Sequence, residues 1–137
     1  MKIIKFKPNI KYKYQRKVLI KNLILNIFIG IHNFERKKKQ KVRFNVEIIT
    51  DPNINPSKKD MTTILNYETI VNKINFLVKK KHHDLLEELA ENIFDVIFKF
   101  RLVKKVKIKI EKLEIIKSFR WRKRVFCRKT WKKSTKT

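Results

Sequence analysis

The sequence predicts an α+β fold, an antiparallel β-sheet with two helices on one of its faces. Apolar and polar residues alternate in residues 40–50 and again in residues 103–110, as in strands that are buried on one side. Between these stretches lie two segments, residues 67–80 and 85–100, whose apolar residues recur at helical spacing. Because the helices follow one another instead of alternating with strands, the order β-β-α-α-β-β indicates an α+β class.

The first two strands are predicted in residues 17–29 and 40–50. Residues 17–29 are apolar, rich in β-branched side chains and broken only by lysine and asparagine. Gly30 allows a bend or bulge after this strand, and the charged residues 32–39 are expected to form a loop. In residues 40–50 the apolar side chains occupy every second position, which predicts a half-buried strand antiparallel to the first. These inward-facing residues are Val42, Phe44, Val46 and Ile48.

The first helix is expected to begin at Tyr67 or Glu68 and to end near Lys80, after the turn-rich loop 51–60. Asn66 is placed to cap its amino end, because asparagine side chains accept hydrogen bonds from main-chain N–H groups there. The apolar positions repeat every three or four residues and predict one buried stripe. That stripe consists of Ile70, Val71, Ile74 and Leu77.

The second helix is expected over residues 85–100. Asp84 is predicted to cap it, with Glu87 three residues later in the capping-box position. His82 and His83 precede the cap and are expected to be solvated residues between the helices. The predicted apolar stripe of this helix contains Leu85, Leu86, Leu89, Ile93, Val96 and Ile97.

Residues 103–110 predict a further strand, with Val106, Ile108 and Ile110 on one face. We expect three parts in the chain: a basic N-terminal extension over residues 1–16, a folded domain over residues 17–117 and a basic C-terminal segment over residues 118–137. The last segment lacks glycine, acids and clear alternation, so it is expected to be either a divergent last strand or a tail.

The net charge of +25 suggests nucleic acid as a partner. Residues 1–21 hold eight bases and residues 117–137 hold ten, with no acid in either stretch, so the charge is concentrated at the two ends. The richness in Lys, Ile, Asn and Phe is also typical of an AT-rich genome, which raises the lysine content without a functional reason. A nucleic-acid-binding role therefore remains an alternative only through the C-terminal segment. There Trp121, Phe126 and Trp131 alternate with basic residues.

Several kinds of site are not expected. The single cysteine, Cys127, rules out an internal disulfide framework and suits a cytoplasmic protein. No apolar run approaches the roughly 20 residues that cross a bilayer, and no secretory signal is expected at the N-terminus. The sequence has no phosphate-binding loop, dinucleotide fingerprint or metal-ligand spacing, so no cofactor and no metal are predicted. His32 is expected to be a loop or interface residue rather than a catalyst.

Four short motifs, in this order and at these intervals, resemble the dihydroneopterin aldolase family of the tunnelling fold. The resemblance covers roughly residues 18–116. The motifs are residues 30–35 (GIHNFE) followed by Gln40, residues 66–67 (NY), residues 85–91 (LLEELAE) and residues 106–112 (VKIKIEK).

This resemblance implies a retro-aldol cleavage of 7,8-dihydroneopterin, a pterin, without metal or cofactor. By similarity, Lys112, Tyr67 and Glu35 would be the catalytic residues, and Glu87 would bind the amino group and ring N–H of the pterin. Leu86, Glu35 and Tyr67 would also bind the substrate. The family further implies a homo-oligomer, a tetramer or an octamer, whose sheets join into a barrel. Its active sites lie between subunits, and the tyrosine comes from the neighbouring subunit.

Two activities remain open under this resemblance. Cleavage followed by re-addition to the opposite face inverts C2′, so one site can act as an aldolase and as a 2′-epimerase. A related epimerase acts on the triphosphate form and needs extra cations near the side chain of the substrate, which Lys37, Lys38 and Lys39 could provide.

Overall fold

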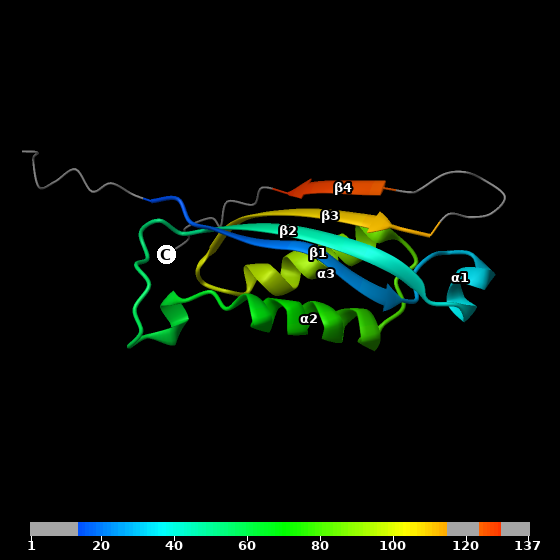
Figure 1. The fold of residues 1–137 in the computed structure, drawn as a ribbon, viewed down its shortest axis with the longest axis horizontal. Coiled ribbons are helices and arrows are strands. Elements are labelled where there is room, and N and C mark those ends of the chain that lie inside the picture. The colour runs from blue at the N-terminus through cyan, green and yellow to red at the C-terminus, as the bar shows by residue number, and fades with distance from the viewer. Residues whose placement is uncertain (1–13, 115–123, 130–137) are drawn as a thin grey trace, which may run out of the picture.

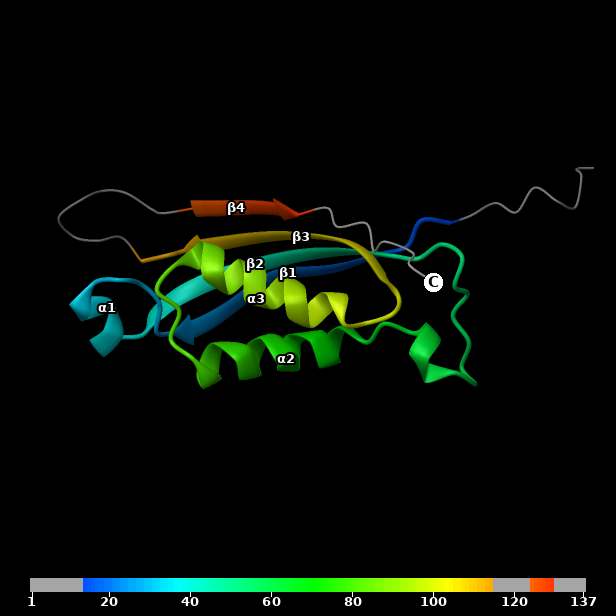
Figure 2. The same ribbon diagram turned by 180° about the vertical axis from the view of Figure 1, so that it is seen from behind.

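The structure is a computed structural model in which residues 14–114 and the strand 124–129 are described. Four strands form one antiparallel sheet in the order β1-β2-β3-β4, and two long helices lie together over one of its faces (Figures 1 and 2). The α+β class and the two helices on one face are thereby confirmed. The elements are β1 (Lys17–Ile27), α1 (Asn33–Lys37), β2 (Gln40–Thr50), the 3-10 turn η1 (Met61–Thr63), α2 (Tyr67–Lys80), α3 (Leu86–Phe98), β3 (Val103–Lys112) and β4 (Arg124–Lys129).

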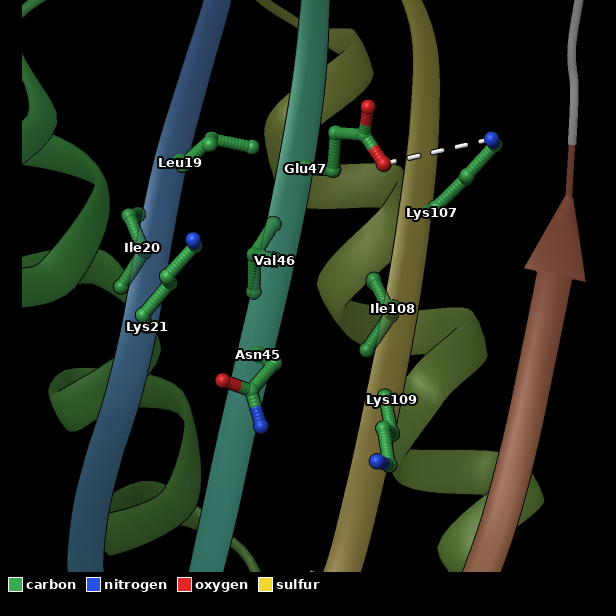
Figure 3. A pocket seen from close by; sticks show the side chains of 9 residues that line it. All are labelled: Leu19, Ile20, Lys21, Asn45, Val46, Glu47, Lys107, Ile108 and Lys109. Atoms are coloured by element: carbon green, nitrogen blue, oxygen red, sulfur yellow. Dashed lines mark ion pairs between the residues drawn. The ribbon is translucent and has the colours of Figure 1, made fainter.

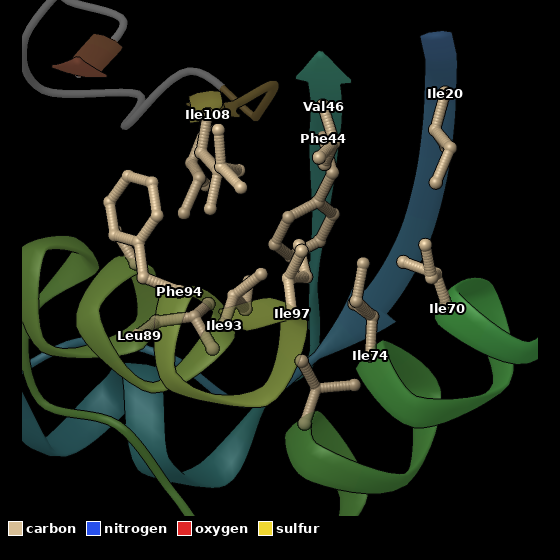
Figure 4. Close-up of a cluster of buried hydrophobic side chains, with 14 of the residues drawn as sticks. Ile20, Phe44, Val46, Ile70, Ile74, Leu89, Ile93, Phe94, Ile97 and Ile108 are labelled. Atoms are coloured by element: carbon tan, nitrogen blue, oxygen red, sulfur yellow. The ribbon is translucent and has the colours of Figure 1, made fainter. Parts of the chain in front are cut away.

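The core lies between the sheet and the helices α2 and α3, and Figure 4 shows side chains from both layers pointing toward each other. The four inward residues predicted for β2 are all buried, as is the predicted inner face of β3. Isoleucine dominates both layers, so burial of branched apolar side chains is the main stabilising contribution to this fold. Core residues that belong to the helices include Ile70, Ile74, Leu89, Ile93, Phe94 and Ile97.

Strand β1 contains a bulge between Ile20 and Leu23, where the pairing with β2 shifts by one residue. Asn22 lies in the bulge with φ of 56°, a conformation that asparagine adopts more readily than most residues. Its N–H donates a 2.9 Å hydrogen bond to Oδ1 of Asn45 on β2. The side chain of Asn45 therefore stabilises the bulge by binding its main chain to the neighbouring strand.

Helix α2 begins and ends as predicted, and Asn66 caps it by accepting a 2.9 Å hydrogen bond from the N–H of Glu68. The capping box predicted for α3 is wrong. Its N-cap residue is Leu85, which makes no side-chain capping bond and is 45% exposed, so Leu85 does not belong to the buried stripe either. Asp84 instead accepts a 2.6 Å hydrogen bond from Arg36, a partner that local sequence patterns do not indicate.

The loop predicted for residues 32–39 contains a helix, α1, of five residues. A helix this short is not stable by itself, and no side chain caps its amino end. It is held by contacts far away in the sequence, because Glu35 on α1 binds Lys112 at the end of β3. Such contacts are absent from the local pattern, which explains why this segment was predicted to be a loop.

The last strand, β4, comes from the basic C-terminal segment and pairs antiparallel with β3. The pairing runs from Val106 opposite Lys129 to Glu111 opposite Arg124. Six residues of this segment therefore form a strand, which counts against a tail there. The tail residues Trp121 and Trp131 lie outside the described residues, as do residues 1–13, and the three-part division of the chain stays a prediction.

No helix in the described part of the chain is long and apolar enough to span a membrane.

Candidate active site

Three segments meet where β3 ends, and their side chains form a compact polar cluster. Nζ of Lys112 donates a 2.6 Å hydrogen bond to Oε2 of Glu35, and Nε2 of Gln40 donates a 2.9 Å hydrogen bond to the same oxygen. The antiparallel register places the start of β2 beside the end of β3, with Val42 opposite Lys112. Gln40 also donates to the carbonyl of Ile29, which fixes the orientation of its amide. We call Glu35, Gln40 and Lys112 the carboxylate–lysine cluster.

Glu35 is a buried carboxylate that stays ionised. Its side chain is 4% exposed, and burial alone would raise its pKa. The hydrogen bonds from Lys112 and Gln40, together with the positive charge of Lys112 and the nearby His32, outweigh burial and hold the pKa of Glu35 below its ordinary value. A carboxylate and an ammonium group in direct contact, largely shielded from water, are suited to proton transfer on a bound substrate.

Gly30, the only glycine in the chain, lies directly against Glu35. Its φ of +128° belongs to the region that favours glycine, which confirms the predicted bend. A Cβ at this position would lie 1.9 Å from Oε2 and 2.1 Å from Cδ of Glu35. Gly30 is therefore required twice, once for its backbone conformation and once for the room that the carboxylate occupies.

The segment between α2 and α3 contacts both main-chain polar groups of Gly30, its carbonyl oxygen and its N–H. Nε2 of His82 lies 2.8 Å from the carbonyl oxygen of Gly30, and the N–H of Gly30 donates a 3.0 Å hydrogen bond to the carbonyl of His83. The prediction that His82 and His83 are solvated is wrong for His83, whereas His82 is partly exposed. His83 is 2% exposed, its ring binds Asn92 at 3.0 Å, and burial lowers its pKa.

The amino end of α3 lies at the same end of the sheet as α1 (Figure 1). Glu87, in the first turn of α3, is exposed and forms no ion pair within the described part of the chain. The side chain of Leu86 is buried in the core, so a ligand at this end can meet Leu86 only through its main chain. His32 lies at the edge of the cluster, with Nε2 3.9 Å from Oε1 of Glu35 and its ring stacked on Phe34.

Tyr67 does not join the cluster within one chain. It is the first residue of α2 and is 60% exposed. The start of α2 lies at the end of the sheet opposite to α1 and to the end of β3 (Figures 1 and 2). If Tyr67 acts with Lys112, the two residues must therefore come from different copies of the chain.

A separate hollow of about 330 Å³ lies on the face of the sheet away from the helices. Figure 3 shows its lining, with the ion pair between Glu47 and Lys107 across two strands. The hollow is in the middle of the strands, around the pair Val46 and Ile108, and does not include Lys112. It is therefore a feature of the sheet face and not part of the cluster.

The described residues contain no group of three His, Cys, Asp or Glu side chains that could hold a metal ion. Two members of the site were missed by sequence reasoning. Gln40 was noted only for its interval from Glu35, and His82 was assigned to solvent. Their contacts depend on how distant segments pack, although the glycine at position 30 was a signal that a close approach was needed there.

Comparison with known proteins identifies the family of the chain. The sequence model of the FolB family, dihydroneopterin aldolase, matches residues 18–123. The chain belongs to this family. The resemblance inferred from the four motifs is thereby confirmed.

Relatives of this FolB family member carry two different names. Over 100 residues it is 30% identical to the dihydroneopterin triphosphate 2'-epimerase of Escherichia coli K12, covering 73% of this chain and 83% of that protein. Over 96 residues it is 28% identical to the dihydroneopterin aldolase of Haemophilus influenzae, covering 70% of this chain and 81% of that protein. Family membership therefore does not by itself decide between the two activities.

The fold is shared with a solved structure, the Escherichia coli dihydroneopterin aldolase in complex with neopterin. The TM-score is 0.70 at 22% sequence identity, and the similarity covers 83% of this chain and 98% of that chain. At this identity the similarity establishes the fold alone.

Proposed function

We propose that this chain cleaves 7,8-dihydroneopterin into 6-hydroxymethyl-7,8-dihydropterin and glycolaldehyde by a retro-aldol reaction. The observation that carries the proposal is the buried contact of 2.6 Å between Lys112 and Glu35 at the end of β3. Membership of the FolB family, whose model is described as dihydroneopterin aldolase, supports this reaction, and the cluster offers a proton-transfer group held in one position.

The reaction needs a base and a place for an electron pair. When the proton of the 2′-hydroxyl group is removed, that oxygen becomes a carbonyl and the bond between C1′ and C2′ breaks. The electron pair of this bond moves into the ring imine, N5=C6, and C1′ is then protonated to give the hydroxymethyl group. The substrate thus provides its own electron sink, and the protein has to position the substrate and move protons.

We assign the proton transfers to Lys112, assisted by Glu35, which accepts a hydrogen bond from Nζ of Lys112. Glu87 is assigned to the amino group and ring N–H of the pterin, because a carboxylate can accept two parallel hydrogen bonds from that edge. Its exposure in the first turn of α3 leaves it accessible to a ligand. Leu86 would contribute its main chain beside Glu87, and Tyr67 would assist proton transfer from a neighbouring subunit.

This assignment requires at least a second copy of the chain, and we propose a homo-oligomer, a tetramer or an octamer in which the sheets join into a barrel. Two observations support it. The start of α2, which is Tyr67, lies at the opposite end of the sheet from the end of β3, which is Lys112 (Figure 1). The helix-free sheet face leaves Leu19 and Ile24 about half exposed. Apolar side chains on such a face are consistent with burial against another copy. A solution mass equal to one chain would contradict the assembly.

Product analysis tests the function directly. The purified chain is incubated with 7,8-dihydroneopterin, and hydroxymethyl-dihydropterin and glycolaldehyde are quantified by chromatography. Equal amounts of the two products, formed at a rate that depends on enzyme concentration, would support the proposal. A chain that is folded and assembled but forms neither product would rule it out.

Epimerisation at C2′ of the triphosphate form is the second candidate. It is favoured by the 30% identity to a protein named as a triphosphate epimerase and by the exposed Lys37, Lys38 and Lys39 after Glu35. Three exposed ammonium groups close to the site would attract a triphosphate. Incubation with dihydroneopterin triphosphate, followed by separation of the C2′ isomers, distinguishes this activity from cleavage.

A further inference from the structure

We propose that His82 is a positioning residue of the active site: by fixing the main chain at Gly30, it holds the carboxylate of Glu35 against Lys112. The inference rests on the proposed function, because it treats the carboxylate–lysine cluster as the catalytic centre. Nε2 of His82 lies 2.8 Å from the carbonyl oxygen of Gly30 and 3.5 Å from Oδ1 of Asp84, and in the described part of the chain His82 forms no hydrogen bond or ion pair with Lys112 or Glu35, so its action is indirect.

The first step is the contact between His82 and Gly30. A carbonyl oxygen can only accept a hydrogen bond, so at 2.8 Å the proton must be on Nε2 of His82. The N–H of Gly30 is bound by the carbonyl of the next residue, His83. Two consecutive residues therefore bind both polar groups of the glycine, one through a side chain and one through the main chain.

The second step is the contact between Gly30 and Glu35. A Cβ on Gly30 would lie inside the carboxylate, with distances of 1.9 to 2.6 Å to its three atoms. The carboxylate of Glu35 therefore packs directly against the Cα of Gly30. A displacement of Gly30 passes directly to Glu35 and, through a 2.6 Å contact, to Lys112.

Among the contacts between these two segments, the one made by His82 is the most suitable for a test. The ion pair between Arg36 and Asp84 is about half exposed on both sides and is expected to contribute little. His83 is fully inside the molecule, so its replacement would disturb the core. The side chain of His82 is 23% exposed, so its replacement disturbs the core less than the replacement of His83 would.

Three variants separate positioning from general stability. In His82→Ala the donor is lost, whereas in His82→Gln the amide places a donor at about the same reach as Nε2. Lys81→Ala is the matched control, because it alters the adjacent exposed residue, whose partner is Glu88 on the helix surface. If His82→Ala does not fold, His82→Asn replaces it, since its amide is polar but too short to reach Gly30.

Steady-state kinetics with 7,8-dihydroneopterin provide the first readout. We expect kcat to fall by about 10-fold to 100-fold in His82→Ala, the range expected when a catalytic group is misplaced by about 1 Å. KM should change little, because Glu87 is untouched. His82→Gln should recover most of the rate, and Lys81→Ala should match the wild type. Wild-type kcat in His82→Ala, or equally low rates in His82→Ala and His82→Gln, would overturn the inference.

Carbon-13 NMR titration of the Glu35 carboxyl provides a readout that does not depend on activity. In His82→Ala the pKa of Glu35 should rise toward its ordinary value, because the hydrogen bonds that lower it become looser. An unchanged titration would overturn the inference even if the rate fell. If the wild type forms no product, the proposed function fails while the titration still decides whether His82 positions Glu35.

Discussion

Replacing Gly30 by alanine would put a methyl group where the carboxylate of Glu35 now lies. The new Cβ would be 1.9 Å from Oε2, so the carboxylate must retreat by about 1.5 Å to reach ordinary van der Waals distance. That movement separates Glu35 from Lys112, whose contact is 2.6 Å. The φ of +128° adds backbone strain, because alanine rarely adopts it.

The expected loss of stability follows from these two effects. Backbone strain of this kind costs about 1–3 kcal/mol, and loosening a buried ion pair costs up to about 3 kcal/mol. Together they predict a loss of about 1–6 kcal/mol in the free energy of unfolding, with a fall in melting temperature of about 3–6 °C for each kcal/mol lost. Catalysis by the displaced cluster should fall at least about 100-fold.

A double-mutant cycle isolates the clash with Glu35 from the strain. Gly30→Ala is measured in the wild type and in a Glu35→Ala background, by urea unfolding at one fixed protein concentration. With the carboxylate removed, only the backbone strain should remain, so the loss should shrink to about 1–3 kcal/mol. An equal loss in both backgrounds would refute the reasoning, because it would mean that Gly30 and Glu35 do not touch.

Three further predictions concern the same site. Lys112→Ala and Tyr67→Ala should each be inactive. When subunits of the two variants are unfolded together and reassembled, up to roughly a quarter of the wild-type rate should return, because some interfaces then combine an intact Lys112 with an intact Tyr67. No recovery would mean that the tyrosine acts within its own chain. Glu87→Gln should raise KM about 10-fold to 100-fold with little change in stability, because a charge-assisted hydrogen bond contributes about 1.5–3 kcal/mol; an unchanged KM would remove Glu87 from the pterin site. Since the folded-state pKa of Glu35 lies below its ordinary value of 4.5, Glu35 stabilises the fold above that pH and loses this effect as the pH falls through the lower pKa. The stability difference between the wild type and Glu35→Gln should therefore shrink on acidification, and a difference independent of pH would contradict the assignment.

Regular elements could be predicted from the sequence because each carries its own signal. The alternation in β2 and the cap at Asn66 are local properties, and both are found in the structure where they were expected. Helix α1 and the burial of His83 carry no such signal, since both depend on contacts with distant segments. Local pattern is informative where the residues of an element carry their own periodicity or cap, and it fails where the structure of a segment depends only on contacts with distant parts of the chain.

The residues of the candidate active site also depend on contacts between distant parts of the chain. Lys112 and Glu35 are 77 residues apart, and no periodicity relates them. They were placed together only through the family resemblance, which supplied residues but not contacts. The hydrogen bonds from Gln40 to Glu35 and from His82 to Gly30 are seen only in the folded chain.

The bulge in β1 has a consequence for how much the length of this strand can vary. Ile20 and Leu23 are an odd number of residues apart, so strict alternation would point them to opposite faces, yet both pair with inward residues of β2. The extra residue at Lys21 and Asn22 corrects that parity. Loss of one residue at the bulge would leave a regular strand with the same inward side chains. Loss of one residue elsewhere in β1 would point the side chains on one side of the deletion to the opposite faces of the sheet.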